Sequence, residues 1–295
     1  MSMKTLFAAL LFVPFGLVVA EAPVRVAVAN YPLKYFTERL AGAHVEIVYP
    51  VSADEDPAFW KPKDDEVAAF QKADVILMNG ATYSKWADKV TLPRRKTVDT
   101  AAGFKDKFIV VANATKHSHG PGGEHSHSGT AFTTWLDLQQ AITQAKAVSE
   151  ALTKKLPAAK DEIEKNFAAL RADIEALDTR LLAAGKKLAN QPLVASHPVY
   201  QYFARRYALH LKDVLWEPEE VPTAEQMADL KKILTAHAAK WMIWEGEPAK
   251  ESVAKVQTLG LQSIVFDPCG NTPGSGDWLS VMKDNVAALE KITAP

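Results

Sequence analysis

The chain is poor in cysteine, with a single thiol, Cys269, in 295 residues. One thiol cannot close an intrachain disulfide, so cross-links are not expected to stabilise the fold. Charge of either sign is not in excess, because 34 Lys and Arg stand against 35 Asp and Glu. A chain without a basic surplus has no long-range attraction for a polyanion, and nucleic acid is therefore not expected as a partner.

Short catalytic motifs are also missing. The sequence contains no Gly-x-Ser-x-Gly elbow, no glycine loop that cradles phosphate and no His-Glu-x-x-His pair, and Cys269 has no base near it in sequence. We therefore do not expect an enzyme. If the protein were an enzyme, the alternative would be a metal hydrolase built on the strand-end residues described below.

Long apolar runs are limited to one, at the N-terminus. Lys4 precedes an apolar run over 6–20, and small residues fit cleavage after Ala20 or Ala22. This pattern predicts a secretory signal peptide over residues 1–22. The run is short for a membrane span, so an uncleaved anchor is the weaker alternative. No cysteine follows the run to carry a lipid, and the expected location is the periplasm of a Gram-negative cell.

Beyond this run, short β-branched stretches alternate with amphipathic helical patterns. Buried strands are predicted at 24–30, 45–51, 74–80, 107–113, 191–197, 211–216, 240–246 and 263–268. Helices in the second half are predicted near 199–208, 223–238, 248–258 and 277–292. Such alternation is typical of parallel sheets covered by helices. The predicted fold class is α/β, with two parallel-sheet domains and a ligand cleft between them.

A helical region separates the two halves. Pro157 divides a helix at about 136–155 from a longer one at about 158–188, which at about 1.5 Å per residue would measure roughly 45 Å. Its apolar residues recur at spacings of four and three, which places them on one face: Ile163, Phe167, Leu170, Ile174, Leu177 and Leu181. We expect one long helix that bridges both domains, with a coiled-coil dimerisation arm as the alternative.

The expected organisation follows from these patterns. An N-terminal α/β domain covers 23–135 and includes a His-rich loop at 114–129, a helical region covers 136–189, and a C-terminal α/β domain covers 190–295. The protein is expected to be a monomer.

Polar residues at strand ends indicate where a ligand binds, because parallel sheets take ligands beyond the carboxyl ends of their strands. In the second half these residues are His197, Glu245 and Asp267. An imidazole and two carboxylates are ligands for a divalent metal. His197 as a helix cap and Asp267 as a turn residue are the structural alternatives.

The stretch "HSHGPGGEHSH" at 117–127 holds half of the eight histidines of the chain, namely His117, His119, His125 and His127. Paired histidines two residues apart around a turn match neither a helical metal pair nor a zinc finger. A rigid four-ligand site is therefore not expected here. A flexible loop that collects metal and a solvated loop both remain open.

The stretch "ASHPVYQYFARRYAL" at 195–209 resembles the "SHxAFxYFxxRYGL" segment of the zinc- and manganese-binding receptors of ABC importers. "ADVILMNGATYSKW" and "TTWLDL" are similar to further segments of that family, and the likeness covers nearly the whole mature chain. The resemblance implies two α/β domains bridged by one long helix. It also implies one zinc or manganese ion as the transported ligand, held in the cleft and handed to an ABC permease in the inner membrane.

The resemblance also implies ligand positions. His197 matches the family's third histidine, and Asp267 matches its closing carboxylate. In "DPAFWKPKD" and "TTW", however, Ala58 and Thr133 stand where the first two histidines are expected.

These departures leave three alternatives. In the first, His125 or His127 and an acid of "DEDP" (Asp54, Glu55 or Asp56) join His197 and Asp267. At about 3.3 Å per extended residue, either loop histidine could reach a ligand position in the cleft roughly 15 to 20 Å from Thr133. In the second, the loop collects ions and the cleft alone holds none. In the third, the cleft takes a non-metal ligand among Phe59, Trp60 and Trp135. An extracytoplasmic metallochaperone or adhesin is the alternative to import.

Overall fold

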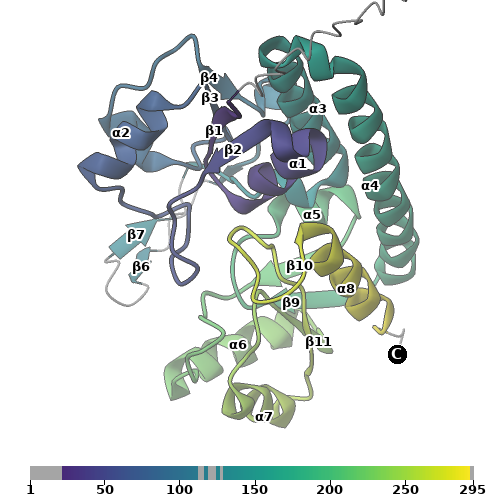
Figure 1. Cartoon of the computed structure of the whole chain (residues 1–295). Coiled ribbons are helices and arrows are strands. Elements are labelled where there is room, and N and C mark those ends of the chain that lie inside the picture. The colour runs from purple at the N-terminus through teal and green to yellow at the C-terminus, as the bar shows by residue number, and fades with distance from the viewer. Residues whose placement is uncertain (1–21, 112–115, 119–123, 127–128, 293–295) are drawn as a thin grey trace, which may run out of the picture.

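The computed structural model describes residues 22–111, 116–118, 124–126 and 129–292. The predicted signal peptide lies outside the described residues, save for its last position. Two sheets, each with its own helices, form the two ends of the molecule (Figure 1). We call residues 22–135 the N-lobe and residues 190–292 the C-lobe.

The N-lobe sheet has four parallel strands in the order β2-β1-β3-β4. Their bounds are β1 (Val24–Val28), β2 (Val45–Val48), β3 (Val75–Met78) and β4 (Thr97–Asp99). The helices are α1 (Tyr31–Ala41) and α2 (Asp64–Lys72), with 3-10 turns at Gly42–His44, Lys85–Lys89 and Ala102–Lys107. Central apolar residues stand in register, so that Val26 faces Ile47 on one side and Val75 on the other, and they form the buried core of this lobe.

One predicted strand of the N-lobe is wrong. The described part of this stretch, residues 107–111, does not join the parallel sheet; it contributes β5 (Val110–Val111), which pairs antiparallel with β8 (Gly129–Thr130). Val110 is 77% exposed, so this apolar run does not fill a core. The fourth parallel strand is β4, whose single large apolar residue is too weak a pattern to predict a strand.

The C-lobe repeats the same strand order, β10-β9-β11-β12. Its strands are β9 (Pro192–Ala195), β10 (His210–Asp213), β11 (Trp241–Trp244) and β12 (Gln262–Val265), and all four lie within predicted stretches or overlap them. The helices are α5 (Gln201–Arg206), α6 (Ala224–Ala236), α7 (Lys250–Thr258) and α8 (Trp278–Glu290). In both sheets the first strand has the second on one side and the third on the other, which opens a crevice at the carboxyl ends.

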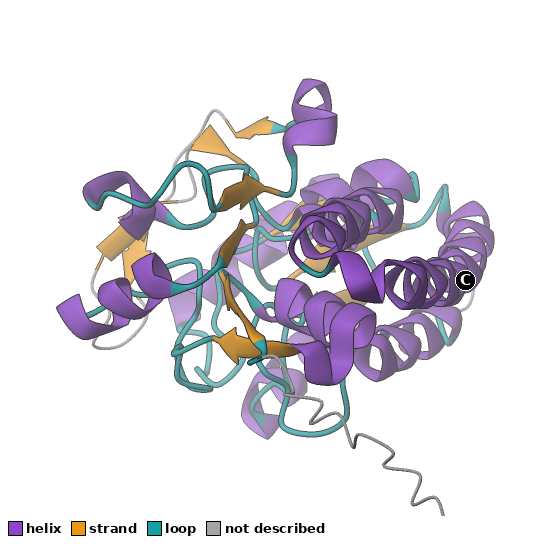
Figure 2. Ribbon diagram, turned by 45° about the horizontal axis from the view of Figure 1, so that its top comes forward, coloured by secondary structure: helices purple, strands orange, loops and turns teal. Residues whose placement is uncertain are grey.

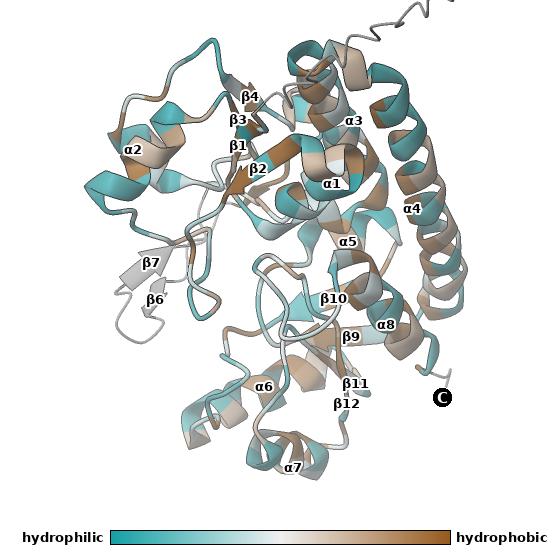
Figure 3. Ribbon diagram, in the orientation of Figure 1, coloured by the Kyte–Doolittle hydropathy of each residue, from teal (hydrophilic) through white to brown (hydrophobic). Residues whose placement is uncertain are grey.

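The helical region consists of α3 (Leu138–Lys155), a 3-10 turn at Pro157–Ala159 and α4 (Lys160–Leu188). With 29 residues, α4 is about 43 Å long. It packs on α1 and α3 and, further along, on α8 of the C-lobe, and the helices gather into one stack beside the strands (Figure 2). Hydrophobic and hydrophilic residues alternate along α4 (Figure 3), and its apolar face is covered within the chain. The bridging helix is therefore confirmed, and the coiled-coil alternative has no free apolar face to use.

The long helix is tied to the C-lobe through Asp178. Its carboxylate accepts hydrogen bonds from Arg206 Nε at 2.9 Å, Arg206 Nη2 at 2.5 Å and the Tyr207 hydroxyl at 2.9 Å. Burial alone would raise the pKa of Asp178, but hydrogen bonds from Arg206, Gln139 and Tyr207 outweigh it and hold the pKa below its usual value. Gly185 permits the close approach, because a Cβ there would stand 2.3 Å from the Tyr207 carbonyl oxygen.

Candidate metal centre

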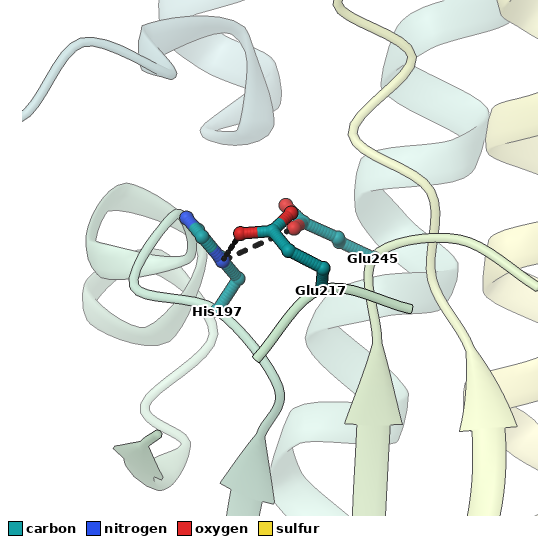
Figure 4. A group of neighbouring side chains, drawn as sticks. All are labelled: His197, Glu217 and Glu245. Atoms are coloured by element: carbon teal, nitrogen blue, oxygen red, sulfur yellow. Dashed lines mark ion pairs between the residues drawn. The ribbon is translucent and has the colours of Figure 1, made fainter. Parts of the chain in front are cut away.

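Three ionisable side chains meet where three C-lobe strands end. His197 follows β9, Glu217 follows β10 after a short loop, and Glu245 follows β11 directly. The strands are parallel and therefore present their carboxyl ends at one edge. Figure 4 shows the three side chains pointing toward one another beyond these strand ends.

The spacing of the group fits one small divalent cation. His197 Nδ1 lies 3.3 Å from Glu245 Oε1 and 3.7 Å from Glu217 Oε1. One donor atom from each of the three residues lies within 4.8 Å of the other two. Nitrogen and oxygen donors bound at about 2.0 to 2.2 Å around a tetrahedral ion stand roughly 3.4 Å apart. A search of the described residues for three or more His, Cys, Asp or Glu side chains close enough to share a metal ion finds this one group.

The site is buried and rich in negative charge. The side chain of His197 is 3% exposed and that of Glu245 is 19% exposed. Burial raises the pKa of Glu245 well above its usual value, and the negative charges of Glu217, Asp56, Asp267 and Glu219 add to the effect. A carboxylate held in this way is destabilised by its surroundings until a positive charge arrives. A bound cation would supply that charge.

The imidazole of His197 is oriented by acceptors. Its Nδ1 faces both carboxylates and lies 3.5 Å from the Trp216 carbonyl oxygen. Three acceptors around one nitrogen favour a hydrogen on that nitrogen in the cation-free protein. A cation that binds Nδ1 therefore requires the other neutral tautomer, with the hydrogen on Nε2.

Asp267 lies close to the group but outside it. Its Oδ1 accepts a hydrogen bond of 2.6 Å from Cys269 N, and its backbone N–H and C=O are both held by the Asn285 amide. Burial raises the pKa of Asp267 although that hydrogen bond lowers it. Cys269 sits in the left-handed region at φ 53° to close this turn, and its thiol is buried. The role of Asp267 as a direct ligand stays a prediction.

The two N-lobe positions where histidines were expected carry no ligand atoms. Ala58 is 2% exposed, and its backbone N–H donates to Asp56 Oδ1 at 2.8 Å. Thr133 is 4% exposed, and its hydroxyl donates to the Val199 carbonyl oxygen across the interlobe boundary. Ala58 is thus part of the buried apolar core, and Thr133 joins the two lobes.

The His-rich stretch forms a hairpin where it is described. β6 (Lys116–Ser118) pairs antiparallel with β7 (Glu124–Ser126), and His117 stands opposite His125 in the register. In Figure 1 this hairpin lies beside the N-lobe, away from the C-lobe strands. His119 and His127 lie outside the described residues. Whether the stretch collects metal, and whether His125 or His127 is a ligand, stays a prediction.

The acidic loop of the N-lobe is tied down through its backbone. Glu55 is exposed, its carboxylate is not part of the group of three, and its carbonyl oxygen accepts a hydrogen bond from Asn271. Among the acids of this loop, Asp56 is the one whose charge raises the pKa of Glu245.

The aromatic residues proposed to line a non-metal cleft are mostly core residues. Trp135 is 1% exposed and donates to the Pro268 carbonyl oxygen at 2.7 Å. Trp60 packs in an aromatic cluster with Phe70 and Trp86. Phe59 is half-buried against Phe132. An aromatic binding wall would need these rings free, so the structure does not favour the third alternative.

Glu217 was missed at the sequence level. The strand was expected to run to residue 216, but β10 ends at Asp213, and a loop of the chain turns Glu217 back over the sheet. The strand-end rule that indicated His197 and Glu245 applies equally to an acid directly after "LKDVLW".

Fold and site together define a two-lobed binding protein with a helix bridging the lobes and an acidic, imidazole-containing group at the interlobe edge. The chain belongs to the family described as "ZnuA: Zinc-uptake complex component A periplasmic", which matches residues 26–292. The predicted resemblance is thereby confirmed. Since this is a family of extracytoplasmic solute-binding components, the prediction that the chain is not an enzyme is confirmed as well.

Individual relatives agree with the family. "Zinc-binding lipoprotein AdcA" of Streptococcus pneumoniae serotype 4 is 24% identical over 287 residues, which are 93% of this chain and 56% of AdcA. The chain thus spans about half the length of the AdcA relatives it matches. "Metal ABC transporter substrate-binding lipoprotein FimA" of Streptococcus parasanguinis is 28% identical over 316 residues, 99% of this chain and 96% of FimA.

The fold also matches a solved structure. The crystal structure of the Zn(II)-bound ZnuA-like domain of Streptococcus pneumoniae AdcA superposes with a TM-score of 0.76 at 21% identity, covering 92% of this chain and 99% of that one. At this identity the match speaks for the fold alone. Within the described part of the chain, no helix has both the length and the apolar character needed to cross a membrane.

Proposed function

We propose that this protein is the periplasmic receptor of an ABC-type importer, and that it captures a divalent cation, zinc or manganese, at His197, Glu217 and Glu245. The cation is cargo, which the receptor delivers to a permease in the inner membrane. The family and the zinc-binding relative AdcA support the cargo. The relative FimA, a metal ABC transporter component, supports the permease as partner.

One observation carries the proposal. An imidazole and two carboxylates, from three strand-end loops, bring donor atoms within 4.8 Å of one another in a nearly buried site. Buried carboxylates without a positive partner are costly, so their gathering favours a cationic ligand. The mixed nitrogen and oxygen donor set suits borderline and hard divalent ions.

The arrangement also suggests how the cation leaves. All three donors come from C-lobe loops, whereas the nearby Asp56 comes from the N-lobe. A partner that tilts one lobe slightly would weaken the combined attraction, and return of His197 to the tautomer with its hydrogen on Nδ1 would favour the empty site. The long helix and its Asp178 anchor favour small tilts over wide hinge opening.

Native mass spectrometry of the zinc- or manganese-loaded protein tests the proposal. The variants are His197→Ala, Glu217→Gln and a deletion of residues 117–127, with Glu247→Gln as a matched exposed control. We expect one bound ion in the parent protein, in the control and in the deletion, and none in the two site variants. Loss in the deletion alone would make the hairpin the cation site and contradict the proposal, as would a parent protein that binds no ion.

A metallochaperone or adhesin on the same fold is the second candidate. It would bind the cation at the same group but without a permease. Uptake assays in cells that carry or lack the neighbouring permease and ATPase genes distinguish the two.

A further inference from the structure

Ser196 lies between the end of β9 and His197, and it is fully buried. Its backbone N–H donates a hydrogen bond of 2.8 Å to the Ile243 carbonyl oxygen of β11. In a regular parallel ladder the carbonyl oxygen of the same residue would accept from that same neighbouring strand. Here it turns to the other side and accepts a hydrogen bond of 2.8 Å from Trp216 N, in the loop after β10. The chain thus changes its hydrogen-bond partner at the residue that precedes His197.

The hydroxyl of Ser196 takes the place of the carbonyl that has turned away. Glu245 N, the next donor along the β11 side, donates to Ser196 Oγ at 3.3 Å. A serine hydroxyl can accept this bond, whereas an alanine side chain offers no acceptor. The hydroxyl therefore holds the peptide that carries the Glu245 side chain.

Ser196 in this way ties together the three chain segments of the candidate metal centre. It is bonded covalently to His197, its carbonyl oxygen holds the residue before Glu217, and its hydroxyl holds Glu245. The Trp216 peptide is held from both sides, since its carbonyl oxygen also lies 3.5 Å from His197 Nδ1. The three side chains that converge in Figure 4 thus share one backbone support.

The residues before the two glutamates are tryptophans that limit the remaining freedom. The ring centroids of Trp216 and Trp244 lie 6.2 Å apart in one buried cluster, and Trp244 Nε1 donates to Ser263 Oγ at 3.1 Å. The chain is therefore anchored one residue before each glutamate. The peptide between Trp244 and Glu245 is the link that the indoles leave free to turn, and its N–H is the one that the Ser196 hydroxyl accepts.

We propose that Ser196 is a positioning residue for the candidate metal centre: its hydroxyl, standing in for a backbone carbonyl, sets where the Glu245 carboxylate lies relative to His197. The inference rests on the proposed function and adds to it a residue that itself binds no cation. Groups that only orient a metal ligand typically contribute roughly 10- to 100-fold in affinity.

Titration calorimetry with zinc and the visible spectrum of the cobalt(II)-loaded protein test this role. Ser196→Ala is expected to raise the dissociation constant of zinc about tenfold, the lower end of the cost of removing a group that orients a metal ligand. At full occupancy its cobalt bands should differ from those of the parent protein, because the bands depend on how the ligands are arranged around the ion. A loss of stability alone would not move them.

Thr100→Val is the matched control. It removes an equally buried hydroxyl from a strand end of the N-lobe, where Thr100 Oγ1 donates to the Met78 carbonyl oxygen at 2.9 Å. This variant should lose stability but keep the zinc affinity and the cobalt bands of the parent. Ser196→Thr keeps the acceptor oxygen and should bind zinc more tightly than Ser196→Ala does.

An unchanged zinc affinity in Ser196→Ala would overturn the positioning role while leaving the proposed function intact. So would a weakened affinity with the cobalt bands of the parent, or a Ser196→Thr variant that binds zinc as weakly as Ser196→Ala. A parent protein that binds neither ion would overturn the proposed function, and the positioning role with it.

Discussion

The two lobes share one strand order but use their strand ends differently. In the C-lobe the carboxyl ends carry His197, Glu217 and Glu245, which lie close together, and burial and the charge of Glu217 raise the pKa of Glu245. In the N-lobe the corresponding ends carry neutral amides: Asn30 Nδ2 donates to Asn79 Oδ1 at 3.0 Å. The same strand order therefore does not determine whether the strand ends of a lobe bind a ligand.

The N-lobe amides form a closed network. Gln144 of α3 donates to the carbonyl oxygen and Oδ1 of Asn79 and to the Thr100 hydroxyl, and accepts from the Thr134 hydroxyl. These side chains are at most 1% exposed. A satisfied neutral network fixes structure, whereas crowded ionisable groups leave a site that a ligand can satisfy. The difference predicts that C-lobe changes alter binding and N-lobe changes alter stability.

The largest effect is expected at Glu245. Glu245→Gln should weaken cation binding about a hundredfold or more, since even partners that only orient a metal ligand cost 10- to 100-fold when removed. The same change should leave the cation-free melting temperature equal or higher, because it removes a destabilised carboxylate. Calorimetry and thermal unfolding measure both. Equal affinity to the Glu247→Gln control would contradict the assignment of Glu245.

The N-lobe counterpart is Gln144→Ala. Loss of its buried hydrogen bonds should lower the free energy of unfolding by about 2 kcal/mol, because Asn79 and Thr100 each lose a donor and the Thr134 hydroxyl loses its acceptor. Cation affinity should change less than threefold. Denaturant unfolding measures the first quantity, with the exposed Gln257→Ala as control. A large loss of affinity with little loss of stability would break the comparison between the lobes.

An intermediate effect is expected from pH. The raised pKa of Glu245 means that the folded, cation-free protein retains a proton there at higher pH than an ordinary glutamate would, and a cation must displace it. Affinity should therefore fall as the pH falls, by up to about tenfold per pH unit for each proton displaced. Calorimetry in buffers of different ionisation enthalpy measures the released protons. Binding without proton release would argue against Glu245 as a ligand.

The stability of the cation-free protein should change with pH in the opposite direction to the cation affinity. Because the folded-state pKa of Glu245 lies above its unfolded value, the folded protein binds that proton more tightly. The cation-free protein should lose stability as the pH rises from the unfolded value to the folded one. The loss should disappear in Glu245→Gln.

The smallest effect is expected at Glu55. Its side chain is exposed and only its carbonyl oxygen is used, so Glu55→Ala should change cation affinity less than twofold. A tenfold loss would instead make the Glu55 carboxylate a ligand, as the sequence alone suggested.

The C-lobe was more predictable than the N-lobe for a physical reason. Its central strands β9 and β11, "PLVA" and "WMIW", are continuous apolar runs that are buried at all but their first residue. In the N-lobe, all three residues of β4 are half-buried, and Val98 is the one large apolar side chain among them. The more apolar stretch nearby contains Val110, which is exposed. Hydrophobic pattern predicts a strand only where pattern and burial agree.

The site was predictable where a residue directly follows its strand. His197 and Glu245 do so closely, and the strand-end rule indicated both. Glu217 reaches the site through a loop, but it directly follows the predicted strand, so the same rule could have indicated it. Asp56 acts from the other lobe, and that path cannot be read from local sequence. The missing histidines at 58 and 133 indicated a changed site but not which residues replace them.

X-ray absorption spectroscopy at the zinc edge of the loaded protein tests the central claim most directly. Our account predicts a first shell of one imidazole with the remaining donors oxygen, and no zinc retained in His197→Ala. A shell of two or more imidazoles that survives His197→Ala would show the ion on the His-rich hairpin and contradict the C-lobe site.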